Sequence, residues 1–223
     1  QWILRIDADE YFTKTLKEKI IIKLKNKQKN FSGISLNRIV KFINKEIHFG
    51  ITSPHKTLRI WKKNKGKCLD HWMDEQIIVE GRVTHVDNSL VDHNINNFDW
   101  WLEKHRKYAK REAINFFLIN NNLDLKDKPK KDLRQINDYY KNKYNKIIMY
   151  YKIPIFIRPI LLFFYSYIFK LGFLSGWQGL IFNLFQVLWF RFQVDMNIFK
   201  IQKKIKKEKL PFKQIINKMY DFP

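Results

Sequence analysis

The chain has 223 residues, and its 43 Lys and Arg against 21 Asp and Glu give a formal net charge of +22. Hydrophobic residues make up 45% and aromatic residues 16% of the chain, enough for a packed core, which excludes a wholly disordered protein. A single cysteine, Cys68, excludes an internal disulfide framework and a cysteine-rich zinc module. The chain begins at Gln1 inside an apolar run, and we interpret it as a piece that lacks its natural N-terminus.

The net positive charge suggests two kinds of partner, nucleic acid or an anionic membrane surface. Lysine greatly outnumbers arginine, whereas bidentate recognition of phosphates and bases favours arginine. Aromatic residues gather in apolar runs instead of alternating with arginine, and no nucleic-acid-binding motif is present. We therefore expect no nucleic-acid partner, and A/T-rich codon usage is a simpler source for many of the lysines.

The first hundred residues are expected to form strands and one helix. A short buried strand over 2–6 ends at the acidic run Asp7-Ala8-Asp9-Glu10. Thr13 is the expected N-cap of a helix that continues to about Lys27. Further strands are expected over 32–42 and 56–61, and a short β-pair around Gly81 over 77–79 and 82–86.

From Asn97 the spacing of apolar residues becomes helical. It predicts one helix to about Asn120 and a second over about 132–151, separated by a polar loop that contains Pro129. Strands followed by helices alone indicate an α/β unit with a helical appendage. The expected domains are therefore residues 1–121 and 122–223.

The last third of the chain is unusually apolar. Residues 159–169 and 171–190 carry no charge, and a strongly basic segment, Lys200 to Lys209, follows them. This combination suits an interfacial helix, which buries apolar side chains among acyl chains while its lysines attract anionic headgroups. Two alternatives stay open. The runs can form the core of the appendage, or the second run can span a bilayer, although its Gly, Ser, Asn and Gln residues make it a poor spanning helix.

Two carboxylates follow the first strand at a spacing of two. Asp7 and Asp9 come at the end of a strand, where α/β folds expose functional groups. Hard oxygen ligands suit Mg²⁺ or Mn²⁺, and such an ion can hold a diphosphate. The alternative is an acidic turn that simply precedes an N-capped helix.

A second polar cluster occupies residues 70–75, between two β-type segments. It contains three carboxylates together with His71 and Trp72. Asp74 or Glu75 can serve as a general base, and the indole offers a flat face to a sugar ring. The alternative is that these acids cap a helical turn.

A third group of polar side chains lies along one edge of the long helix expected after Asn97. Trp101, His105, Tyr108 and Glu112 share that edge, and Lys104 lies beside it. This edge can pack against the α/β unit and supply polar groups to it. A single histidine on such a helix is, however, more often structural.

Taken together, these blocks resemble family 2 glycosyltransferases, and most closely the bacterial enzymes that build lipopolysaccharide core or other surface polysaccharide. The resemblance covers most of residues 1–120 and, more loosely, the region from Gly172 to Gly179. The blocks that carry it are, in chain order, Trp2-Ile3-Leu4-Arg5-Ile6-Asp7-Ala8-Asp9-Glu10, then Arg59 and Trp72-Met73-Asp74-Glu75-Gln76-Ile77, then Asp92-His93-Asn94, then Trp101 to Ala113 with Lys104, His105, Tyr108 and Glu112.

The resemblance implies a partial GT-A (Rossmann-like) sheet-and-helix unit, followed here by a membrane-associating helical region. It also implies a nucleotide-diphosphate sugar donor, a divalent metal (Mn²⁺ or Mg²⁺) and inversion at the anomeric carbon. Asp9 would bind the metal, and Asp7 would contact the donor ribose or a metal-bound water. Glu75 or its neighbour Asp74 would be the base. The remaining candidates for contacts to donor phosphate or acceptor are Arg59, Trp72, His71, Lys104 and His105.

The acceptor implied by the resemblance is a cell-surface glycan or a lipid-linked glycan, at the cytoplasmic face of the bacterial inner membrane. Such enzymes begin with a βαβ region that binds the nucleotide base and that would precede Gln1. We therefore predict no robust turnover by these 223 residues alone. The alternative is a non-catalytic remnant that binds the membrane or a partner enzyme.

Overall fold

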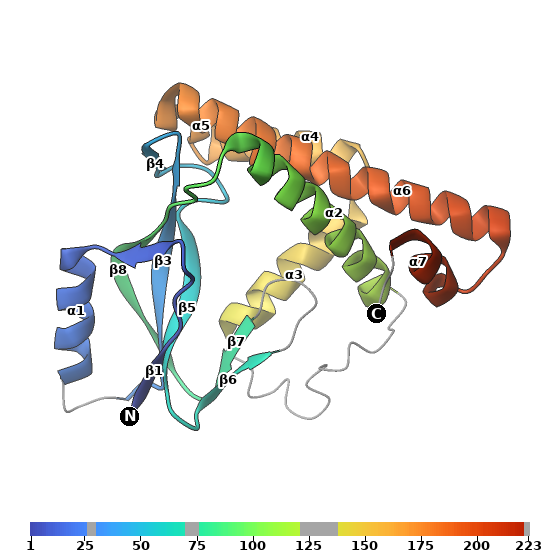
Figure 1. The fold of residues 1–223 in the computed structure, drawn as a ribbon. Coiled ribbons are helices and arrows are strands. Elements are labelled where there is room, and N and C mark those ends of the chain that lie inside the picture. Colours follow the sequence, from blue (N-terminus) through green and yellow to red (C-terminus); the bar gives the residue numbers. More distant parts are fainter. Residues whose placement is uncertain (26–29, 70–75, 121–137, 221–223) are drawn as a thin grey trace.

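The computed structural model describes residues 1–25, 30–69, 76–120 and 138–220. These residues form a mixed α/β fold in which a curled sheet comes first and helices follow it (Figure 1). The expected order of an α/β unit and a helical region is confirmed at this level. The loop expected over 120–131 and the polar cluster at 70–75 lie outside the described residues.

The larger sheet has the strand order β1-β5-β3-β8-β2, with β4 paired to β3. β3 and β8 are parallel, and every other described pair of neighbouring strands in this sheet is antiparallel. A separate hairpin is formed by β6 and β7. The bounds are β1 (Trp2–Leu4), β2 (Glu10–Phe12), β3 (Gly33–Phe42), β4 (Lys45–Ile47), β5 (His55–Lys62), β6 (Gly66–Leu69), β7 (Gln76–Val79) and β8 (Val83–Asp92).

The predicted pairing of 77–79 with 82–86 is wrong. β7 pairs with β6, with Ile78 opposite Lys67, and β8 pairs with β3 and β2 instead. Gly81, at φ +94°, turns the chain between β7 and β8 without forming a hairpin. Two short apolar runs around a glycine look like a hairpin, but β8 continues to Asp92 and finds a longer partner in β3. The three-residue strand β2 was not expected.

Helix α1 (Lys14–Lys25) begins where the sequence predicts. The Thr13 hydroxyl accepts the backbone N–H of Leu16 at 3.3 Å and supplies the N-cap. Leu16 and Ile20 are buried against the sheet, where α1 lies alongside the strands (Figure 1). The other buried members of this cluster are Ile34, Leu36, Ile60, Val86 and Leu90.

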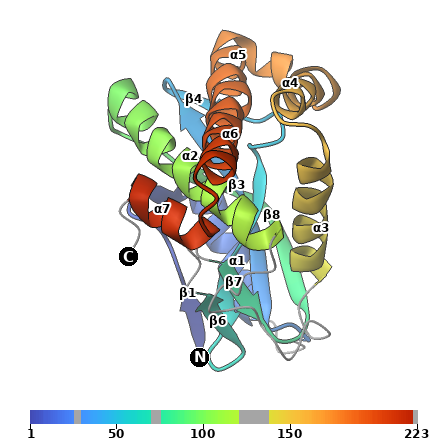
Figure 2. The same cartoon turned by 90° about the vertical axis from the view of Figure 1, so that its right-hand side faces the viewer.

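The helices that follow the sheet share a second core. Ala109 and Ala113 of α2 pack with Val194, Ile198 and Ile201 of α6, and α2 lies along α6 in both views (Figures 1 and 2). The packing thus groups α2 with the later helices, although the predicted boundary at residue 121 assigned it to the first domain. The bounds are α2 (Phe98–Asn120), α3 (Asp138–Lys152), α4 (Ile157–Phe164), the π-helical turn η1 (Tyr165–Phe169), the 3-10 turn η2 (Gly172–Ser175), α5 (Gly176–Asn183), the π-helical turn η3 (Leu184–Trp189), α6 (Phe190–Glu208) and α7 (Phe212–Tyr220).

Aromatic side chains join the sheet to the helices. The ring of Phe42, at the end of β3, lies 5.4 Å from the ring of Phe182 on α5 and 6.4 Å from that of Trp101 on α2, measured between centroids. Ile47 of β4 belongs to the same buried cluster. These contacts fix the position of the helices relative to the sheet.

The apolar C-terminal runs form short, bent helices. Within the described ranges, no single helix is both long and apolar enough to cross a bilayer. Ile157–Phe169 and Gly172–Glu208 meet that requirement only together, as a pair bent by 70°. Gly172 permits the close approach at the bend, because a Cβ there would lie 2.9 Å from the Ser166 carbonyl oxygen.

Candidate functional site

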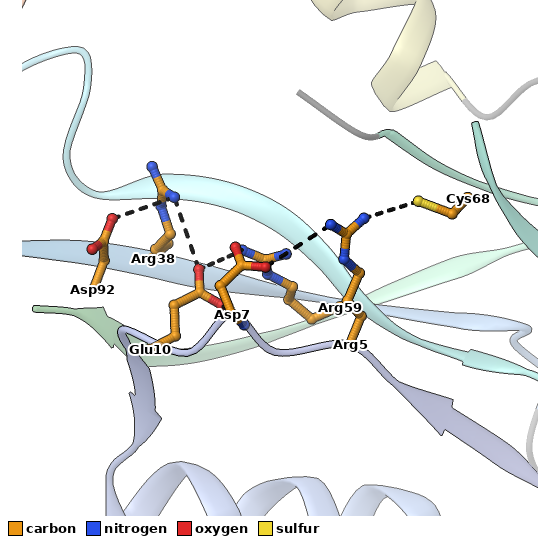
Figure 3. Close-up of polar contacts among 7 residues, drawn as sticks. All are labelled: Arg5, Asp7, Glu10, Arg38, Arg59, Cys68 and Asp92. Carbon is orange, nitrogen blue, oxygen red and sulfur yellow. Dashed lines mark hydrogen bonds and ion pairs between the residues drawn. The ribbon is translucent and has the colours of Figure 1, made fainter. Parts of the chain in front are cut away.

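A row of side chains with alternating charge crosses the larger sheet (Figure 3). Its arginines come from the residue after β1, from β5 and from β3, and its carboxylates come from the turn that follows, from β2 and from the end of β8. We call this row the charge ladder. Its members in order are Arg5, Asp7, Arg59, Glu10, Arg38 and Asp92.

Glu10 is the centre of the charge ladder, and its side chain is fully buried. Arg59 forms an ion pair with Glu10 and also donates to Asp7 at 2.9 Å. Arg38 lies 3.8 Å from Glu10 and 3.4 Å from Asp92. A buried carboxylate without a cation is destabilising by several kcal/mol, roughly, so these arginines are what allows acids to gather here.

The acidic turn after β1 is closed on itself. The backbone N–H of Glu10 donates to the carbonyl of Asp7 at 3.0 Å, and the Glu10 carboxylate accepts the N–H of Asp7 at 3.2 Å. Both side chains at the ends of the turn are thereby held inside the ladder. Asp9 lies between them, and its side chain takes no part in these two hydrogen bonds.

Asp9 differs from its neighbours because its carboxylate makes no ion pair or hydrogen bond with the described residues. Its backbone carbonyl accepts the N–H of His93 at 2.8 Å, which ties the turn to the end of β8. Its side chain is half-buried. Among the described residues, the turn therefore places the half-buried carboxylate of Asp9, which has no ionic partner there, beside the paired carboxylates of the charge ladder.

Electrostatic interactions connect Asp92 with Asp9 and with Lys104 of α2. Burial raises the pKa of Asp92, and the negative charges of Asp9 and Glu10 raise it further, while Arg38 and Lys104 oppose the shift. Lys104, a predicted substrate-binding residue, is thus within electrostatic reach of this site. Its amine also lies over the ring of Trp100, at 4.8 Å from the centroid.

Asp7 and Asp9 are the carboxylates that could hold a divalent cation here. Within the described ranges, no three His, Cys, Asp or Glu side chains are arranged to enclose a metal. Mg²⁺ is commonly held by only one or two protein carboxylates together with substrate phosphates and water. Asp9, with Asp7 close by but paired to Arg59, fits such an open site and does not fit a closed protein cage.

The predicted site residues have three different fates. Asp7 and Arg59 are paired within the ladder, and Asp9 lies in the same turn but outside it; Arg59 is 7% exposed and paired with two carboxylates. His105 is buried, its ring stacks on Trp101 at 3.6 Å between centroids, and its Nδ1 contacts the Trp101 carbonyl at 2.8 Å. This position suits helix packing and gives no support to a substrate contact. The predicted base and its neighbours, His71, Trp72, Asp74 and Glu75, lie outside the described residues.

Reasoning from the sequence did not single out Glu10, Arg38 or Asp92 as ladder members. A signal was present for Arg38, because an arginine within a strongly apolar strand needs a buried acidic partner. Arg59, between Leu58 and Ile60, carries the same signal. Their partners depend on the order of the strands in the sheet, which local patterns do not give.

No protein-family model matches the chain, and neither the curated proteins nor the solved structures contain a significant match.

Proposed function

We propose that the chain is part of an inverting glycosyltransferase of partial GT-A (Rossmann-like) fold. It transfers a sugar from a nucleotide-diphosphate donor to a cell-surface glycan or lipid-linked acceptor at the cytoplasmic face of the bacterial inner membrane. One observation carries the proposal. Two blocks far apart in the sequence meet at Asp9, the turn after β1 and Asp92-His93 at the end of β8, and a third, Lys104 on α2, acts electrostatically on Asp92.

The metal site in this proposal is centred on Asp9. A bound Mn²⁺ or Mg²⁺ supplies charge neutralisation for the departing diphosphate. Asp9 would hold the ion through its carboxylate, which pairs with no described residue, while Arg59 fixes Asp7 at the edge of the site. The closed acidic turn and Arg59 hold the Asp7 carboxylate before any ligand binds, which reduces the entropy lost when the donor is ordered.

The other groups of the chain divide the remaining tasks. In an inverting transfer, the acceptor oxygen bonds to the anomeric carbon while the bond from that carbon to the diphosphate oxygen breaks. The hydroxyl proton passes to a base, which the resemblance assigns to Glu75 or Asp74. The Lys104 ammonium, close enough to influence Asp92, adds positive charge on the α2 side where a phosphate group would approach.

The first experiment measures binding of Mn²⁺ by the 223-residue chain, with and without nucleoside diphosphates, from the electron paramagnetic resonance signal of free Mn²⁺. We expect a nucleoside diphosphate to strengthen Mn²⁺ binding, and Asp9→Asn to weaken it by about tenfold or more, because a neutral amide is a poorer ligand for a hard cation. Asp87→Asn, at an aspartate whose side chain is 88% exposed on β8, is the matched control and should bind as the wild type does.

Two results would count against the proposal. Equal Mn²⁺ affinity in the wild type and in Asp9→Asn would remove the metal site. Mn²⁺ binding that no nucleoside diphosphate enhances would argue against an ion at Asp9 that holds a diphosphate. Circular dichroism of both variants shows whether the fold survives the substitution.

A further inference from the structure

The outer side of α4 and η1 carries an apolar stripe. Its residues follow the spacing i, i+3, i+4, i+7, i+8, i+11, which places them on one helix face. In a soluble protein such a face would be polar, yet here all six side chains are apolar or aromatic and between 42% and 53% exposed. They are Ile157, Ile160, Leu161, Phe164, Tyr165 and Ile168.

The stripe continues around the bend into η2 and α5. Phe169 is 73% and Trp177 is 58% exposed. Three further exposed apolar side chains lie between them: Leu171, Phe173 and Leu174. We call the eleven residues of this surface the apolar rim. So many exposed large apolar side chains within one short segment mark an interaction surface.

The segment that carries the apolar rim contains basic residues and no acidic ones, whereas Glu46 lies next to Lys45 on β4. The sequence contains no Asp or Glu between Asp138 and Asp195. Exposed lysines do flank the rim: the Lys170 amine lies over the Tyr165 ring at 5.6 Å, and the Lys45 amine lies close to Gly176, 2.9 Å from where a Cβ would be. Apolar side chains bordered by lysines, with Trp and Tyr among them, match the acyl-chain boundary of an anionic bilayer.

Both ends of the α4–η1 helix are attached to the rest of the protein. At its start, Arg158 is bound by Asp195 of α6, which also accepts the N–H of Phe156 at 2.8 Å. At its end, the Lys170 carbonyl accepts the N–H of Gly50 at 3.1 Å, and the Ser166 hydroxyl accepts that of Ile51 at the same distance. Gly50 and Ile51 belong to the β4–β5 connection, so the sheet itself holds the bend.

These attachments decide how the rim can meet a bilayer. If α4–η1 crossed the membrane, one of its two anchored ends would carry α6 or the sheet into the hydrocarbon. If the helix lies in the plane of the membrane, only the exposed stripe enters, and both anchors stay in water. Phe49, 38% exposed in the β4–β5 connection, is next to the bend because its N–H donates to the Ser175 hydroxyl at 3.3 Å.

We infer that the apolar rim docks in the plane of an anionic lipid surface, inserting into one leaflet without crossing it. The sheet and the charge ladder are then held at a fixed height above that leaflet. The inference builds on the membrane location in the proposed function, but its test needs neither donor nor activity, so the two can fail separately.

The experiment is flotation of the 223-residue chain with phosphatidylcholine vesicles that do or do not contain phosphatidylglycerol. We expect the wild type to float with the anionic vesicles and more weakly with the neutral ones. Phe169→Glu/Trp177→Glu should reduce the apparent partition coefficient by about tenfold or more, because two charges then enter the acyl boundary. Ile22→Glu, at an α1 isoleucine that is 69% exposed, is the matched control and should float as the wild type does.

Fluorescence quenching reports the depth of insertion. Lipids brominated near the headgroup should quench Trp177 more than lipids brominated near the chain end, with Trp177→Phe giving the background from the other tryptophans. Failure of the wild type to float, or flotation of the double variant at the wild-type level, would overturn the inference. Stronger quenching from the chain ends would overturn in-plane docking, and a dimer that the double variant dissociates, without flotation, would assign the rim to a second copy of the chain.

Discussion

The ion pair between Arg158 and Asp195 fastens α4 to α6, and its removal is expected to destabilise the protein more than any exposed pair. Each side chain is only 1% exposed. The Arg158 Nε donates to Asp195 Oδ1 at 2.8 Å, and the guanidinium lies over the Tyr150 and Tyr151 rings, 5.1 Å from each centroid. In Arg158→Met the aliphatic bulk remains, but Asp195 keeps only the Phe156 N–H as a described donor.

The expected size of this effect follows from burial. Removing one partner of a buried pair costs about 3–5 kcal/mol, because the other charge is left in apolar surroundings. For a chain of this length, 1 kcal/mol corresponds to roughly 2–4 °C in Tm, so Arg158→Met should lower Tm by roughly 6–20 °C. The double variant Arg158→Met/Asp195→Asn should recover a large part of the loss, because it leaves no uncompensated charge.

Thermal unfolding followed by circular dichroism measures these differences. Lys204→Met is the matched control, since Lys204 and Glu208 form a part-exposed pair at 3.8 Å on α6. It should change the free energy of unfolding by about 0.5 kcal/mol or less. A loss for Arg158→Met no larger than that of the control would refute the reasoning, as would a double variant no more stable than the single one.

Two further predictions concern the charge ladder and the buried histidine. Arg59→Met removes the closest cation from Glu10 and should lower the free energy of unfolding, measured by denaturant titration, by about 3 kcal/mol. Arg5→Met should lower it by about 1 kcal/mol or less, because its partner Asp7 is 4.0 Å away and part-exposed. Equal losses in the two variants would contradict the central role given to Arg59 and Glu10 in the charge ladder. Burial lowers the pKa of His105 below its ordinary value of 6.5, so the stability contributed by its neutral ring is complete above that pH and is lost as the pH falls through the folded-state pKa. The fall in Tm from about pH 7 to about pH 5 should therefore be shallower in His105→Gln than in the wild type. An unchanged slope in His105→Gln would refute the assignment.

The parts of the fold that the sequence could predict are those governed by local chemistry. The Thr13 cap, the buried stripe of α1 and the position of β3 follow from neighbouring residues alone. The alternation predicted within β3 is wrong, since Gly33 to Leu36 are all buried. The partners of β7 and β8 could not be predicted in this way, because strand order depends on contacts between distant segments. β2 was not predicted, because three residues are too few to show the alternation of apolar and polar side chains that marks a strand.

In the candidate site too, local sequence identifies the acidic residues, but only the order of the strands decides which of them are paired. Asp7 and Asp9 stand out locally, as two acids after an apolar strand. That Asp7 would be bound by an arginine while Asp9 would not depends on β5 lying beside β1, which brings Arg59 to the turn. His105 illustrates the opposite case, where a polar residue at an attractive helical spacing serves packing.

Residues 49–51, in the β4–β5 connection, bind the bend between η1 and η2 to the sheet, so that the two are held together. Three consecutive backbone N–H groups, those of Phe49, Gly50 and Ile51, are used by the bend, and Gly50 adopts φ +116°, a conformation that other residues rarely take. Transplanting the C-terminal helices onto an unrelated sheet would therefore leave the Ser166 and Ser175 hydroxyls without these donors. A chimera would need this short connection as well as the helices, and the two parts are expected to be inherited or engineered together.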